Sequence, residues 1–156
     1  MSLFCLCVIE NVKNDEKNFF VQQIEMLAEY HKRSVKFLVD WNEPIISKIK
    51  KNSLIINILD CPKSDNCELF LLPDGWYSNG HTEKLSFEER IKLLQDITNI
   101  FLSKKYRVDF YFGQSGTQPE DFLNIALEAD DLANYLAETI GVNGVDDGLH
   151  ITIITG

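Results

Sequence analysis

Short apolar runs alternate with amphipathic stretches along the chain, and this alternation restricts the fold more than any other feature. Leu3–Ile9 and Ser53–Leu59 have the length and residue types of buried strands, whereas Asp15–His31 repeats apolar residues at helical spacing. The same criteria predict strands at 3–9, 36–41, 53–59, 68–72, 107–112 and 149–155, and helices at 15–31, 44–51, 86–103 and 119–140. We therefore expect a single α/β domain over residues 1–156, with a mixed sheet of about six strands and helices packed on it.

The composition is that of a globular protein, with 45% apolar and 25% charged residues. The first residues are apolar, but they lack the basic start and the small-residue cleavage site of a signal peptide. No apolar run approaches the roughly 18 residues of a membrane-spanning helix. These features predict a cytoplasmic protein without a membrane partner.

Charge is distributed unevenly along the chain, whose formal net charge is −9. Residues 1–107 contain all 15 Lys and Arg residues and 15 of the 24 acids, so they sum to zero. Residues 108–156 contain the other nine acids and neither Lys nor Arg. A field of one sign repels nucleic acid and anionic membranes, and it attracts basic proteins. We therefore expect a basic protein partner and no nucleic-acid partner.

The predicted helix 119–140 concentrates this charge. Thr117 and Glu120 have the spacing of a capping box, and one helical stripe is apolar. The opposite face carries acids around Leu127 and Tyr135, as a binding surface with apolar anchors would. The alternative is that another segment covers Leu127, or that the helix breaks near Asp130. The expected partner-binding residues, including two acids of the next turn, are Glu120, Asp121, Leu127, Glu128, Asp131, Tyr135, Glu138, Asp146 and Asp147.

Signatures of catalysis are weak. The segment 113–117 lies between a strand and a helix, but it lacks the last glycine of a nucleophile elbow and the lysine of a phosphate loop. The loop 74–81 carries Trp76, Tyr77 and His81, which either form a binding lip or fold back over the core. A small-molecule or metal-dependent enzyme using this loop is therefore a second hypothesis. We predict no catalytic residue, cofactor or metal site.

The four cysteines have the pattern of reduced thiols. Cys5 and Cys7 lie two residues apart within an apolar run, which places both on the same face of a strand. We expect them to be small core residues. Cys61 and Cys67 flank a polar loop at a spacing that no common zinc motif uses, and we expect two free thiols.

A small acidic chain with reduced cysteines and without a catalytic signature resembles the immunity proteins of bacterial toxin systems, those of contact-dependent growth inhibition above all. The resemblance rests on size and charge over the whole chain, and it transfers no individual residue. It implies a protein that binds and neutralises a cationic toxin domain, such as a nuclease. A third hypothesis is a homo-oligomeric structural subunit that uses the same helix face.

Overall fold

A computed structural model describes residues 3–31, 34–37, 44–50, 52–59, 87–114, 116–143 and 148–154. Their strands form one sheet in the order β2-β3-β1-β4-β6-β5. Neighbouring strands are antiparallel except for β5 and β6, which are parallel, so the sheet is mixed. The strands are β1 (Leu3–Ile9), β2 (Ser34–Phe37), β3 (Leu54–Leu59), β4 (Val108–Gln114), β5 (Leu123–Glu128) and β6 (Leu149–Ile154).

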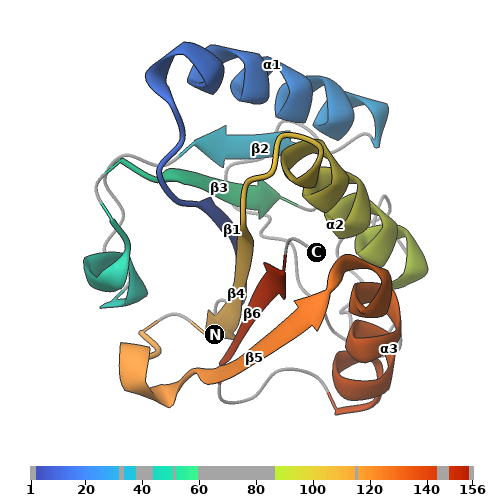
Figure 1. Ribbon diagram of the computed structural model, residues 1–156. Coiled ribbons are helices and arrows are strands. Elements are labelled where there is room, and N and C mark those ends of the chain that lie inside the picture. The colour runs from blue at the N-terminus through green and yellow to red at the C-terminus, as the bar shows by residue number, and fades with distance from the viewer. Residues whose placement is uncertain are drawn as a thin grey trace.

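The described helices are α1 (Asn14–Tyr30), α2 (Phe87–Leu102) and α3 (Leu132–Asn143), with short 3-10 segments η1 (Pro44–Lys48), η3 (Pro119–Asp121) and η4 (Ala129–Asp131). Figure 1 shows α1, α2 and α3 arranged along one side of the sheet. This architecture confirms the predicted α/β class with a mixed sheet and helices packed on it. None of the described helices is long and apolar enough to cross a membrane.

The two faces of the sheet have separate cores because successive strand residues point to opposite sides. On the helix-covered face, Cys5, Phe110 and Ile151 pack with helix residues such as Phe20 and Leu94. The other face is smaller and is covered only in part among the described residues. There, a second cluster joins Leu6 and Val8 of β1 to Ile45 of η1 and to Phe122. We call this second side the open face.

Local sequence explains why α1 forms and how it packs. Phe20, Ile24 and Ala28 recur every four residues and are all buried. At the end of the helix, His31 lies with its Nε2 atom 3.0 Å from Oδ2 of Asp96 on α2. At its start, the Tyr106 hydroxyl donates a 2.7 Å hydrogen bond to a Glu16 carboxylate oxygen. These contacts join α1 to α2 and to the segment that follows α2.

The predicted single helix 119–140 is wrong. The chain instead forms η3, the strand β5 and η4, and α3 begins only at Leu132. Residues 123–128 pair in register with β6, from Leu123 opposite Leu149 to Glu128 opposite Ile154. Pairing satisfies the backbone groups on one side of β5, and it turns Ile125 and Leu127 toward the main core. The first of these segments, η3, begins after Gln118 rather than after Thr117, and Gln118 makes no side-chain cap hydrogen bond.

Two further expectations have clear outcomes. Cys5 and Cys7 are fully buried, free thiols in the main core, as predicted. The predicted strand 36–41 begins earlier, as β2, and residues 38–41 lie outside the described residues. The predicted strand 68–72, Cys61 and Cys67 also lie outside them.

Candidate functional site

Six exposed acidic residues of the described last third lie before β5, at its end and after it, rather than along one helix face. Glu120 and Asp121 precede the strand in η3, Glu128 ends it, and Asp130 and Asp131 follow in η4. Glu138 lies on α3. All six residues are exposed. We call this set the acidic rim: Glu120, Asp121, Glu128, Asp130, Asp131 and Glu138.

The two expected apolar anchors are not exposed anchors. Leu127 is half-buried on β5 and packs against the main core, and Tyr135 of α3 does the same. The strand alternation of β5 explains this, because Leu127 shares the helix-covered face with Ile125. The exposed large apolar residue of β5 is Leu123, with 60% of its surface accessible. The predicted acids are therefore exposed, but the two predicted apolar anchors are not.

A polar network occupies the centre of the open face. Asp109 of β4 has only 2% of its side chain exposed and accepts three hydrogen bonds. The donors are His150 Nε2 at 2.8 Å, the Thr152 hydroxyl at 2.7 Å and Arg107 Nε at 2.9 Å. Burial by itself would raise the pKa of the Asp109 carboxyl, but these three bonds and the charge of Arg107 lower it below its ordinary value. Asp109 is thus a buried carboxylate that is held in the ionised form.

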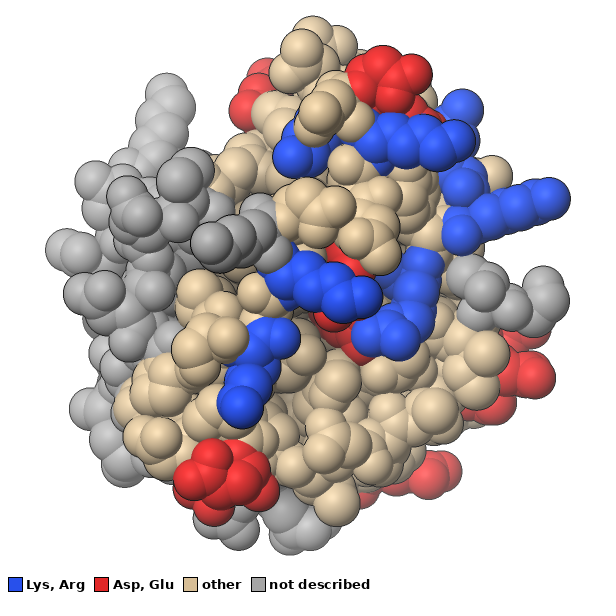
Figure 2. All heavy atoms as spheres, turned by 60° about the vertical axis from the view of Figure 1, so that its left-hand side comes forward, with Lys and Arg blue, Asp and Glu red and all other residues tan. Residues whose placement is uncertain are grey.

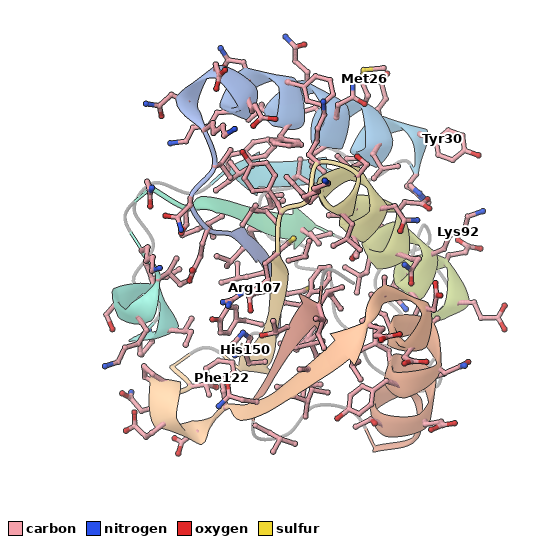
Figure 3. The ribbon with its side chains drawn as sticks, viewed as in Figure 1. Met26, Tyr30, Lys92, Arg107, Phe122 and His150 are labelled. Atoms are coloured by element: carbon pink, nitrogen blue, oxygen red, sulfur yellow. The ribbon has the colours of Figure 1, made fainter. Side chains whose placement is uncertain are left out.

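His150 links the network to β5. Its Nδ1 atom lies 2.6 Å from the Asn124 side-chain oxygen, while the Asn124 amide nitrogen donates to the Phe122 carbonyl at 3.2 Å. The imidazole stacks on the Tyr111 ring, with 4.2 Å between centroids and 7° between planes. Figure 3 shows Arg107, His150 and Phe122 in one column on the side of the sheet away from α2 and α3. Both ring nitrogens therefore face oxygen atoms, so neither is available to take a proton from a substrate in this arrangement.

The Tyr111 hydroxyl is also poorly suited to proton transfer. Burial, with the nearby charges of Asp109 and Glu10, raises the pKa of Tyr111 to about 12. The network of Arg107, Asp109, Asn124, His150 and Thr152 joins β4, β6 and β5 through side chains. We interpret it as a structural clamp between these strands.

Basic residues reach the open face from outside residues 108–156. Lys50 Nζ and an Arg107 guanidinium nitrogen lie 3.6 and 4.0 Å from the same Glu10 carboxylate oxygen. Figure 2 shows Lys and Arg side chains gathered across the middle of the face that it presents, around a small acidic area, with another acidic area at the lower edge. The 3-10 segment η1, which carries Lys48, contacts η3, which carries Glu120 and Asp121, so basic and acidic residues lie near each other at this end of the rim.

The remaining site predictions fall where the structure gives no description. Trp76, Tyr77, His81, Asp146 and Asp147 lie outside the described residues. Within the described ranges, no group of three or more His, Cys, Asp and Glu residues is placed to hold a metal ion. Sequence reasoning missed the network, although Asp109, His150 and Thr152 all stand at polar positions inside otherwise apolar strands.

Comparisons with known proteins add no information about function to this geometry. Searches with the chain against protein-family models, curated proteins and solved structures find no match.

Proposed function

We propose that this protein binds a basic protein domain through the acidic rim and neutralises it, as the immunity protein of a bacterial toxin does. The observation that carries the proposal is the placement of exposed acids on both sides of β5, in a segment of 49 residues without Lys or Arg. That segment contributes no positive side chain, and an excess of one charge speeds the encounter with a partner of the opposite charge.

The rim suits a cationic toxin because such a domain needs a basic groove to hold nucleic-acid phosphates. Carboxylates placed in that groove would compete with the phosphates for the same Lys and Arg residues. Apolar contacts at the centre of an interface usually supply much of the affinity. Leu123, exposed between the two ends of the rim, is the residue we assign to that role in place of Leu127 and Tyr135.

The test uses the C-terminal toxin domain encoded beside this protein's gene, with its catalytic residue inactivated. A rim variant changes Glu120, Glu128 and Asp130 to Lys, and a matched control changes Glu25, Glu29 and Glu88 to Lys. All six residues are exposed, and both variants make the same change in net charge. We expect the rim variant to lose about 100-fold or more in affinity at low salt, and the control to stay within about threefold.

Calorimetry at two salt concentrations distinguishes the outcomes. The native affinity should fall as salt rises, and co-expression of the active toxin should kill cells carrying the rim variant but not the control. If both variants weaken binding equally, the affinity depends on the total charge of the protein and not on the acids of the rim. Unchanged binding by the rim variant, or a neighbouring gene that encodes no toxin, would overturn the proposal.

A further inference from the structure

The strand β5, which lies between the two ends of the acidic rim, is an edge strand of the described sheet. Figure 1 shows β5 at the edge of the sheet, and among the described residues its one neighbour is β6. The Leu123 N–H donates to the Gly148 carbonyl at 3.2 Å, so the backbone of Leu123 points toward β6. Backbone direction alternates along a strand, so Ile125 and Leu127 also face β6. The N–H groups of Asn124, Ala126 and Glu128 therefore point away from the sheet.

Within β5 itself, the usual devices that prevent strand addition are missing. Exposed edges are normally protected by Lys or Pro, by bulges or by shortness. The sequence of β5 is LNIALE, in which the one charged residue stands at the last position. At the opposite edge, β2 has four residues and contains Lys36. Ala126, at the centre of the open edge, is small and exposed.

The charges at the two ends of β5 define what would fit there. Six residues of strand span roughly 20 Å, so the edge can pair with about six residues of another chain. Glu120 and Asp121 stand at one end, and Glu128, Asp130 and Asp131 stand at the other. A segment with Lys or Arg at each of its ends would meet acids at both, while its central residues paired with the backbone of β5.

We propose that β5 receives an extended basic segment of the partner protein as an additional strand of the sheet. The proposal rests on the proposed function for the basic character of the partner. It adds that recognition is made by backbone hydrogen bonds along Asn124 to Glu128, and that the rim charges select and position the segment. The occupant is one short stretch of the partner rather than a broad surface of it.

Proline at position 126 tests this directly. Ala126→Pro removes one outward N–H and leaves the bonds between β5 and β6 in place, since proline is tolerated on the outer side of an edge strand. Ala126→Val is the matched control, because valine keeps the N–H and suits a strand. The probe is a fluorescent peptide, KVTVTVTK, measured by anisotropy. A second probe has the same sequence, with N-methyl groups on alternate residues that block pairing and leave charge unchanged.

We expect Ala126→Pro to weaken peptide binding at least tenfold and Ala126→Val to stay within about threefold of the native protein. The N-methylated peptide should bind the native protein at least tenfold more weakly, a result that holds even if the proline variant fails to fold. In hydrogen exchange, the amides of Asn124, Ala126 and Glu128 should gain protection when the peptide binds.

The outcomes separate the two proposals. If the rim variant loses the toxin domain while Ala126→Pro and the N-methylated peptide behave like their controls, strand addition is wrong and rim binding stands. If the rim variant keeps the toxin domain, the proposed function is wrong. No binding of KVTVTVTK at millimolar concentration, or equal binding of its methylated form, would also overturn strand addition.

Discussion

Removal of the Asp109 carboxylate should destabilise the protein strongly. The side chain is almost fully buried and accepts bonds from His150, Thr152 and Arg107. A hydrogen bond to a charged group contributes about 1.5–3 kcal/mol, and a donor left unpaired in the interior adds its own cost. Arg107 is 54% exposed, so water can replace its partner and its share is small. The two inner bonds therefore predict a loss of about 3–5 kcal/mol for Asp109→Ala.

Asp109→Asn is the milder version of the same change. The amide keeps one oxygen for His150 and Thr152 and turns its nitrogen toward Arg107, which is the partner that water can best replace. We expect roughly half the loss of the alanine variant, about 2 kcal/mol. Urea unfolding at pH 7 measures both values, and the exposed Asp121→Asn serves as the control that leaves the midpoint unchanged.

The effect should depend on pH in one direction. The folded-state pKa of Asp109 lies below its ordinary value of 3.8, so the ionised carboxylate stabilises the folded state above pH 3.8. That stabilisation is lost as the pH falls through the lowered folded-state pKa. The free-energy difference between the native protein and Asp109→Asn should therefore be larger at pH 5 than at pH 3. A loss under about 1 kcal/mol at pH 7, or a difference that does not shrink in acid, would refute the argument.

Three further predictions concern single side chains. Leu127→Ala should lower stability by about 1–3 kcal/mol in urea unfolding because Leu127 packs on the core, and it should not weaken binding of the toxin domain. Weaker binding at unchanged stability would instead show that Leu127 belongs to the interface. Gly148→Ala should cost more than Gly116→Ala, about 2 against about 1 kcal/mol by thermal melting. Both glycines have positive φ, but a Cβ at Gly148 would lie 3.1 Å from a Thr117 methyl carbon, whereas one at Gly116 meets nothing; equal melting shifts would contradict this. In a background with Cys61→Ser and Cys67→Ser, Cys5 and Cys7 should react with a thiol reagent only on unfolding, because both are buried and burial raises their pKa; rapid reaction of the native protein would show that β1 opens.

The error at 119–140 shows where local sequence becomes ambiguous. Phe122, Ile125, Ala129, Leu132 and Leu136 fit one helical stripe, and Ala, Leu and Glu favour helices. The shorter stretch 123–128 also alternates, with apolar residues at 123, 125 and 127, which is the pattern of a strand. Both patterns fit the same residues, and local propensity could not choose between them.

The polar network could not be predicted from the sequence for a related reason. Asp109, His150 and Asn124 lie far apart along the chain, and each alone is compatible with a solvent-exposed strand position. Only the pairing of Tyr111 with His150 across β4 and β6, and of Asn124 with His150 across β5 and β6, brings these side chains together. The register between strands depends on residues far apart in the sequence, so no spacing of residues along the chain could predict that these side chains meet.

The amino-acid sequence by itself determined the α/β class, helices α1 and α2 in outline, the buried cysteines of β1 and the absence of positive charge after Arg107. These follow from hydrophobic periodicity and composition, which act locally. Only the tertiary structure decided that residues 123–128 extend the sheet instead of a helix. Pairing with β6 satisfies backbone groups and buries Ile125 and Leu127 at once, and that gain exists only when the distant partner strand is in place. Because of this pairing, the acids expected on one helix face instead precede and follow an edge strand of the described sheet.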